Sequence, residues 1–335
     1  MTYEKYYSLY QVKSRNKRRN IQIIGEIVKY TIKLGGIFMP IIRTPEDRFT
    51  NLPDYPFKPN YVDINGARVH YLDEGEGEVI LCLHGEPTWS FLYRHMIPLL
   101  SQEHRVIAPD FIGFGRSDKY TEREEYSFEM HMNTLKEFIN YLRLERITIV
   151  VQDWGGLIGL GVVADTPDLF ARLVILNTGL PTGETSPTEG FLNWRNYVEH
   201  TLDLPIGKII RRSLAPGNKL SKEVISAYDA PFPTADYKAG AQVWPLLVPI
   251  TIDDPGAAQM RKAKDVLKEW DKPAFVAFSD SDPVTRGGDR FFRKIIPTAI
   301  NEPAVVIEQA GHFLQEEKGA EIAEHIIAFT KRNPL

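Results

Sequence analysis

Six short runs of apolar residues, spaced along the chain from residue 79 onward, most constrain what this chain can fold into. Each run is nearly continuous Val, Ile, Leu and Ala, the composition of strands buried on both faces of a sheet. Segments of helical length separate the runs, and this alternation predicts a doubly wound, mostly parallel α/β sheet. Before them, residues 62–65 and 67–71 meet at Asn65-Gly66, a dipeptide typical of a tight hairpin turn. The runs are 79–83, 105–108, 147–151, 173–176, 274–278 and 304–307.

The alternation of strand and helix stops between residues 181 and 250. No strong strand run lies there, and the segment instead has proline-containing breaks and seven aromatic residues. We therefore expect a helical cap over 181–250, inserted into a core made of 39–180 and 251–335.

Composition excludes several other classes of protein. Hydrophobic residues are 43% of the 335 residues and charged residues 25%, unlike disordered or collagen-like chains. The single cysteine cannot form an intrachain disulfide, so no oxidising compartment is implied and we expect a cytoplasmic protein. We find no metal-ligand spacing, phosphate loop or dinucleotide fingerprint, so we expect no metal and no cofactor.

The first 38 residues differ from the rest in charge. Residues 1–38 carry eight Lys or Arg against Glu4 and Glu26, within a chain of net charge −4. We interpret this segment as a loosely ordered extension. Two alternatives are a basic amphipathic helix over 24–32 that lies on a membrane surface, and a physiological start at Met39. The segment is too short and too poor in aromatic pairs to indicate nucleic-acid binding.

The segment after the third run has the form of a nucleophile elbow. Residues 151–156 read VQDWGG, and the two glycines permit a sharp strand-to-helix turn. Esterases place Ser where this chain has Asp153. A carboxylate that attacks an sp³ carbon forms an ester that water can cleave, whereas the ether formed by Ser would resist hydrolysis. Asp153 therefore predicts displacement on an alkyl carbon followed by hydrolysis; the alternative is a simple helix N-cap.

Two further motifs follow strand runs, at the sheet edge where parallel sheets bind ligands. In the loop LHGEPTW, the backbone N–H of Glu86 is placed to form an oxyanion hole together with that of Trp154. The preceding His84 is assigned a structural role. In QAGHF, which follows the last run, His312 is placed as the general base for the hydrolytic water.

The acid that orients His312 has two possible positions, after the fourth run or after the fifth. Asn177 occupies the first position and is not an acid. The second holds both Asp280 and Asp282. We choose Asp282 and keep Asp280 as the alternative.

These motifs resemble those of the haloalkane dehalogenases, a family with the α/β-hydrolase fold, over most of residues 41–335. Within this family, the chain resembles the subfamily whose acid follows the later strand. The sister subfamily has Asn at the position of Glu86 and Glu after the earlier strand, where this chain has Asn177. The resemblance implies hydrolysis of a haloalkane to an alcohol, halide and a proton, with water as the only co-substrate. We expect a monomer. The matching segments are 43–45, 84–89, 108–115, 152–156 and 310–313.

The resemblance also implies two halide-binding tryptophans, which match Trp154 after the nucleophile and Trp194 early in the cap. An indole N–H can solvate a leaving halide without competing as a nucleophile, because it donates and offers no acceptor. Leu157 stands where the family often has Phe, which predicts a reshaped cavity. The other implied pocket residues are Phe191, Trp244 and Val248.

Two alternatives to a dehalogenase differ from it in the residues that they need. An epoxide hydrolase shares the Asp nucleophile and the His–Asp pair, and it needs cap tyrosines, which this chain offers at 197, 228 and 237. Its oxyanion loop usually has an aromatic residue where Glu86 stands, which favours the dehalogenase. A non-catalytic protein of this fold usually lacks the nucleophile or the histidine, and both are present here.

Overall fold

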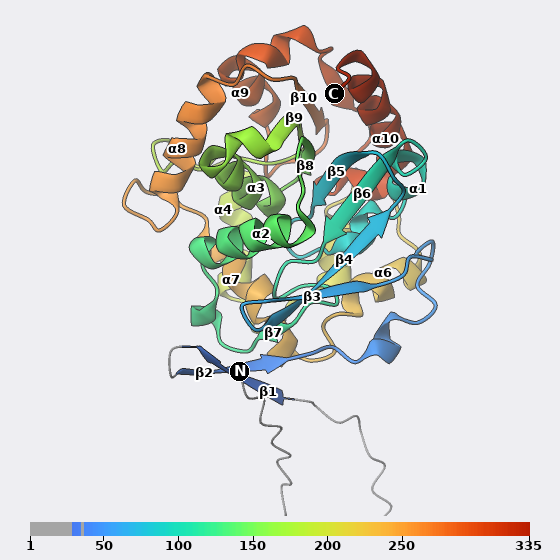
Figure 1. Cartoon of the computed structure of the whole chain (residues 1–335). Coiled ribbons are helices and arrows are strands. Elements are labelled where there is room, and N and C mark those ends of the chain that lie inside the picture. Colours follow the sequence, from blue (N-terminus) through green and yellow to red (C-terminus); the bar gives the residue numbers. More distant parts are fainter. Residues whose placement is uncertain (1–28, 35–36) are drawn as a thin grey trace, which may run out of the picture.

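A computed structural model describes residues 29–34 and 37–335 of the chain and has a large central sheet (Figure 1). The eight strands of this sheet are ordered β11-β10-β9-β8-β5-β6-β4-β3, and the six from β11 to β6 are parallel. Each parallel strand coincides with one of the six apolar runs, so the predicted α/β fold is confirmed. These strands are β5 (Glu78–Leu83), β6 (His104–Pro109), β8 (Ile147–Val151), β9 (Phe170–Ile175), β10 (Ala274–Ser279) and β11 (Val305–Ile307).

The predicted hairpin forms the antiparallel end of the same sheet. Strands β3 (Asn60–Ile64) and β4 (Ala67–Glu74) pair with each other, and β4 pairs with β6. The turn residues Asn65 and Gly66 have φ of 53° and 87°. Positive φ at both positions is the geometry that Asn-Gly favours, so the sequence signal has a direct backbone cause.

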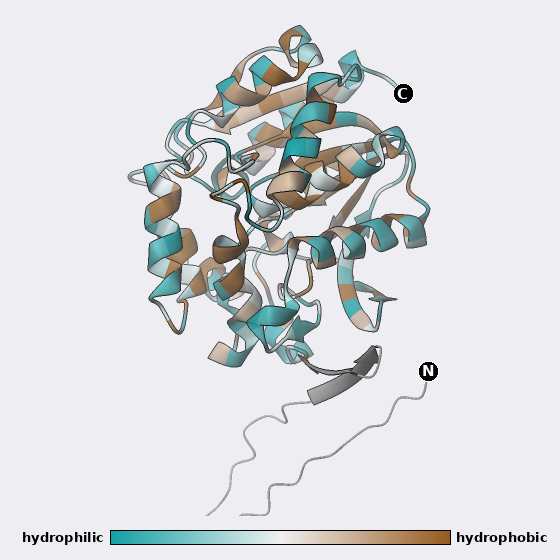
Figure 2. Cartoon of the chain, turned by 90° about the vertical axis from the view of Figure 1, so that its left-hand side faces the viewer, coloured by the Kyte–Doolittle hydropathy of each residue, from teal (hydrophilic) through white to brown (hydrophobic). Residues whose placement is uncertain are grey.

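Helices cover both faces of the sheet. Helices α2, α3 and α8 pack together on one face, whereas α1 and α10 pack against each other on the opposite face (Figure 1). In Figure 2 the helices carry hydrophilic and hydrophobic residues on different sides, as expected of helices that bury one face. Their bounds are α1 (Ile97–Leu100), α2 (Phe128–Leu142), α3 (Trp154–Asp165), α8 (Ala257–Lys268), α9 (Gly288–Ile295) and α10 (Leu314–Arg332).

Four helices lie between β9 and α8, within the segment expected to form a cap. They are α4 (Glu189–Glu199), α5 (Ile206–Arg212), α6 (Lys222–Asp229) and α7 (Ala239–Leu247). The structure assigns no strand to residues 181–250, all of which it describes. One buried link to the core runs from the Thr44 hydroxyl, which donates to the carbonyl of Pro231 at 2.7 Å.

A small second sheet precedes the core. Strands β1 (Lys29–Leu34), β2 (Ile37–Ile42) and β7 (Lys119–Tyr120) form an antiparallel sheet in that order. The alternative of a helix over 24–32 is therefore wrong for 29–32, where the sequence YTI has the residues that favour strands. Residues 24–28, like all of 1–28, lie outside the described residues. The expected boundary between 38 and 39 falls inside β2. Among the residues described, no helix is long and apolar enough to cross a membrane.

Candidate active site

The nucleophile elbow is a sharp turn between β8 and α3. Asp153 has φ of 49° and ψ of −126°, a strained conformation for a residue with a side chain. The turn needs the glycine after Trp154, because a Cβ at Gly155 would lie 2.1 Å from the carbonyl oxygen of Leu83. The Asp153 side chain caps no backbone N–H of α3, so the structure does not support the simple N-cap alternative.

The Asp153 carboxylate faces two predicted partners. Its Oδ1 accepts a hydrogen bond from the backbone N–H of Glu86 at 2.7 Å. Its Oδ2 lies 3.4 Å from Nε2 of His312. The second predicted donor, the N–H of Trp154, is the first amide of α3, where helices lack an internal acceptor. The structure therefore brings the predicted nucleophile, oxyanion donors and base together.

Asp282 and Asp280 have different neighbours. Nδ1 of His312 lies 2.9 Å from Oδ2 of Asp282, which is 4% exposed. Asp282 also accepts hydrogen bonds from the backbone N–H of Val284 and the hydroxyl of Thr285. Asp280 instead accepts from the amides of residues 309 and 310. Of these two aspartates, only Asp282 contacts the His312 imidazole. The contact is at Nδ1, so Nε2 remains directed at Asp153.

The charges of this cluster favour a protonated imidazole. Burial alone would lower the pKa of His312, but the Asp282 charge and the hydrogen bonds with Asp153 and Asp282 raise it to about 10. Burial would likewise raise the pKa of Asp282, and the charge of His312 keeps it below its usual value. Loss of the Asp153 charge would remove one of the groups that hold the proton on His312.

Glu86 has a buried carboxyl close to this cluster. Burial, and then the charge of Asp153, raise the pKa of Glu86 well above its usual range. A neutral carboxyl adds no second negative charge next to the nucleophile. An interaction with the Trp194 side chain from the cap partly opposes this rise in the pKa of Glu86.

Two side-chain amides at the site were missed as functional residues by sequence reasoning. The Asn177 amide donates to the carbonyl oxygens of Gly311 and His312 at 3.0 and 3.1 Å. The Gln152 amide donates to the same His312 carbonyl at 3.3 Å. Gln152 directly follows the end of β8, and Asn177 lies two residues after the end of β9; these positions were the available signal. His84 is fully buried and binds backbone groups of Gly85 and Phe111, in agreement with a structural role.

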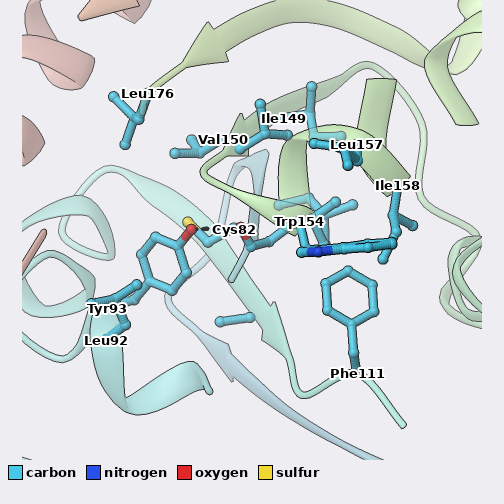
Figure 3. Close-up of a cluster of buried hydrophobic side chains, with 14 of the residues drawn as sticks. Cys82, Leu92, Tyr93, Phe111, Ile149, Val150, Trp154, Leu157, Ile158 and Leu176 are labelled. Carbon is cyan, nitrogen blue, oxygen red and sulfur yellow. Dashed lines mark hydrogen bonds between the residues drawn. The ribbon is translucent and has the colours of Figure 1, made fainter. Parts of the chain in front are cut away.

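A cavity of about 450 Å³ opens in front of Asp153. It is lined by both predicted halide-binding residues, Trp154 and Trp194. Figure 3 shows Trp154 among buried apolar side chains that include Leu157, Ile158 and Phe111. The predicted pocket residues that line the cavity are Leu157, Phe191 and Val248.

Trp244 does not line the cavity, contrary to the prediction. Its ring is fully buried and lies 4.7 Å from the ring of Trp154, with an interplanar angle of 31°. The Trp244 indole N–H donates to Nε2 of His131 at 2.7 Å. The next residue of α7, Pro245, lines the cavity instead. Successive helix positions point about 100° apart, so a single step along α7 separates the cavity wall from the layer behind it.

The described part of the chain contains no group of three or more His, Cys, Asp or Glu residues placed to hold a metal ion.

Comparison with known proteins agrees with this fold. Residues 78–319 match the family model of the α/β hydrolase fold, so the chain belongs to that class. Haloalkane dehalogenases of Psychrobacter cryohalolentis and Mycolicibacterium paratuberculosis are 48% and 44% identical. The first alignment covers 88% of this chain and 100% of the relative, and the second covers 87% and 98%.

A solved structure agrees with these relatives. The tetrameric haloalkane dehalogenase DpaA from Paraglaciecola agarilytica is 38% identical with a TM-score of 0.81, over 86% of this chain and 98% of that chain. The chain therefore belongs to the haloalkane dehalogenases, hydrolases that act on carbon–halide bonds, and haloalkane and water are its substrates. The predicted function is confirmed, and the epoxide hydrolase alternative is not favoured.

Proposed function

We propose that Asp153 displaces halide from the sp³ carbon of a haloalkane and that His312, oriented by Asp282, activates the water that cleaves the resulting ester. The observation that carries this proposal is the position of Asp153 at the cavity, with Oδ2 at 3.4 Å from Nε2 of His312. This proximity supports a two-step hydrolysis that uses one carboxylate and one imidazole.

In the first step Asp153 attacks the carbon through Oδ2, because Oδ1 accepts the N–H of Glu86. A carbon–oxygen bond forms as the carbon–halogen bond breaks, and the electron pair of that bond leaves with the halide. The indole N–H groups of Trp154 and Trp194 solvate the negative charge that develops on the halogen. The apolar walls Phe191 and Val248 strengthen this electrostatic stabilisation by excluding water.

In the second step water attacks the carbonyl carbon of the Asp153 ester. Esterification removes the charge of Asp153, so the pKa of His312 falls and the imidazolium releases its proton to solvent. The neutral imidazole then accepts one proton from the attacking water. The N–H groups of Glu86 and Trp154 stabilise the oxyanion. Collapse of the intermediate breaks the bond between the carbonyl carbon and the alkyl oxygen, and the second proton of the attacking water passes to the leaving alkoxide to give the alcohol. His312 keeps the first proton beside the restored carboxylate.

A comparison of two substrates tests this mechanism. We expect halide release from 1-bromobutane or 1,2-dibromoethane, and no diol formation from styrene oxide. Diol formation without halide release would contradict the proposal, because it would require protonation of an epoxide oxygen rather than solvation of a halide. Leu157 lines the cavity where the family often has the larger Phe. Halide release from a panel of longer haloalkanes is therefore the next measurement.

The division of the chain into a core, a cap and an extension is a second proposal. We propose a core of 39–180 and 251–335, a cap of 181–250 and an extension of 1–38, in a cytoplasmic monomer that binds no nucleic acid. The complete set of site residues within one chain supports the monomer, and the tetrameric solved relative offers the alternative. Light scattering of the purified protein distinguishes one copy from four. Activity of a chain that starts at Met39 tests whether the extension is needed.

A further inference from the structure

The loop that carries His312 rests on the cap as well as on the core. The backbone N–H of His312 donates to the carbonyl of Ser213, in the segment between α5 and α6, at 2.9 Å. The approach is close, because a Cβ at Gly311 would lie 2.0 Å from the same carbonyl oxygen. The position of the base therefore depends on a cap segment distant in sequence.

One carboxylate joins the two sides of this contact. Glu317, in the first turn of α10, accepts the N–H of Gly311 on Oε2 at 2.6 Å. Its Oε1 accepts the N–H of Ala215 at 2.9 Å and the side-chain amide of Asn218 at 2.5 Å. Each carboxylate oxygen is thus committed to a different partner, Oε2 to the histidine loop and Oε1 to the cap.

Asn218 adds a second link between the cap and the same loop. Its side-chain amide donates to the carbonyl of Gln309 at 3.0 Å while it also contacts Glu317. On the core side, the loop is held by Asn177, which binds the carbonyls of Gly311 and His312. The core therefore holds the carbonyls of Gly311 and His312, whereas their N–H groups bind Glu317 and Ser213.

We propose that Glu317 is a positioning residue that fixes His312 for the water-activating step and couples that step to a docked cap. The proposal rests on the proposed role of His312 as the base. If the cap moves away, the N–H of His312 loses its hydrogen bond to the Ser213 carbonyl. The N–H of Gly311 stays bonded to Glu317, but the Glu317 carboxylate no longer has the N–H of Ala215 to hold it in place. A displacement of about 1 Å in a catalytic group can slow a reaction by about 10²-fold.

The proposal predicts an effect on one step only. The first step uses the Asp153 carboxylate and the tryptophan N–H groups, and none of these contacts Glu317 in the hydrogen bonds of the described residues. The second step needs His312 at the correct distance from water. Loss of Glu317 should therefore slow ester hydrolysis and leave ester formation unchanged.

Glu317→Gln is the decisive variant. An amide has one acceptor oxygen, so its NH₂ group must face the N–H of either Gly311 or Ala215. We expect a rapid burst of about one halide per enzyme at the wild-type rate, followed by turnover reduced about 10-fold or more, the loss expected for a hydrogen bond to a charged group. Mass spectrometry should show the alkyl ester accumulating during turnover. Glu324→Gln, an exposed carboxylate on the same helix, is the control and should change neither rate.

Asn218→Ala removes the contacts of Asn218 with Glu317 and with the Gln309 carbonyl, but it leaves the contact between Glu317 and Gly311 in place. We expect a smaller reduction of about 2- to 5-fold, in ester hydrolysis only, as for a neutral hydrogen bond. A folded Glu317→Gln protein that slows the burst and the turnover equally, or neither, would overturn the proposal. If that variant does not fold, unchanged ester hydrolysis in Asn218→Ala overturns it. No halide release by the wild-type protein would instead refute the proposed function.

Discussion

The proposed nucleophile, Asp153, and the proposed base, His312, are held in different ways. Asp153 lies in a turn between one strand and one helix, and the turn residue Gly155 fits directly against the neighbouring strand end. His312 is held by Asp282, by the core amide of Asn177 and by the cap carbonyl of Ser213. The nucleophile is therefore fixed mainly by local structure, whereas the base depends on segments that only tertiary packing brings together.

Asp153→Asn should have the largest effect and act on the locally built side of the site. The amide keeps the shape of the side chain but is not a nucleophile, so turnover should fall by at least about 10⁴-fold. Steady-state halide release from 1-bromobutane measures it. The surface variant Asp265→Asn should retain wild-type activity. Halide release by Asp153→Asn at the wild-type rate would show that another group attacks the carbon.

His312→Phe should stop turnover by a different route. Without a base the ester cannot be hydrolysed efficiently, and we expect turnover to fall by about 10²–10⁴-fold. Ester formation should continue, so intact-protein mass spectrometry should find the mass of the enzyme increased by one alkyl group. Sustained turnover with no such adduct would mean that His312 is not the base, and the comparison between the two regions would lose its chemical basis.

Trp194→Phe should weaken halide binding without removing either catalytic step. One hydrogen bond to an anion contributes about 1.5–3 kcal/mol, so halide affinity should fall roughly 10- to 100-fold. Quenching of tryptophan fluorescence by bromide measures the change. Trp270→Phe is a suitable control, since Trp270 lies outside the cavity that Asp153 faces. Equal quenching in all three proteins would return Trp194 to a packing role.

The pH dependence of stability tests His312 and its two carboxylate partners in the absence of substrate. The pKa of His312 is raised to about 10 in the folded chain, against about 6.5 in an unfolded one. The proton therefore stabilises the fold fully below pH 6.5, and this contribution is lost as pH rises toward 10. The free energy of unfolding in urea, measured between pH 6.5 and pH 10, should decline more steeply with pH for the wild type than for His312→Phe. Parallel declines would contradict the raised pKa.

Much of the fold and site could be predicted because the signals are local. Each parallel strand needs only a short apolar run, and the Asn65-Gly66 turn needs two residues that tolerate positive φ. The elbow at Asp153 is likewise specified by a few neighbouring residues, and its chemistry follows from a carboxylate in place of a hydroxyl.

Other features could not be read in this way. The sequence left Asp280 and Asp282 as alternatives, and their positions relative to His312 distinguish them. Trp244 was predicted to line the cavity, but the orientation of α7 turns its ring toward Trp154 and His131. Helical rotation and loop path depend on the packing of whole elements, which no short motif encodes.

The sequence by itself determined the order of strands and helices along the chain, the candidate nucleophile and base, and the family resemblance. Only the tertiary structure decided which carboxylate meets His312, which tryptophans face the cavity and how Glu317 ties the base to the cap. The physical reason is range. A turn or a strand is selected by the conformations of adjacent residues, whereas a contact between residues about a hundred positions apart exists only after the core and the helices over it have packed.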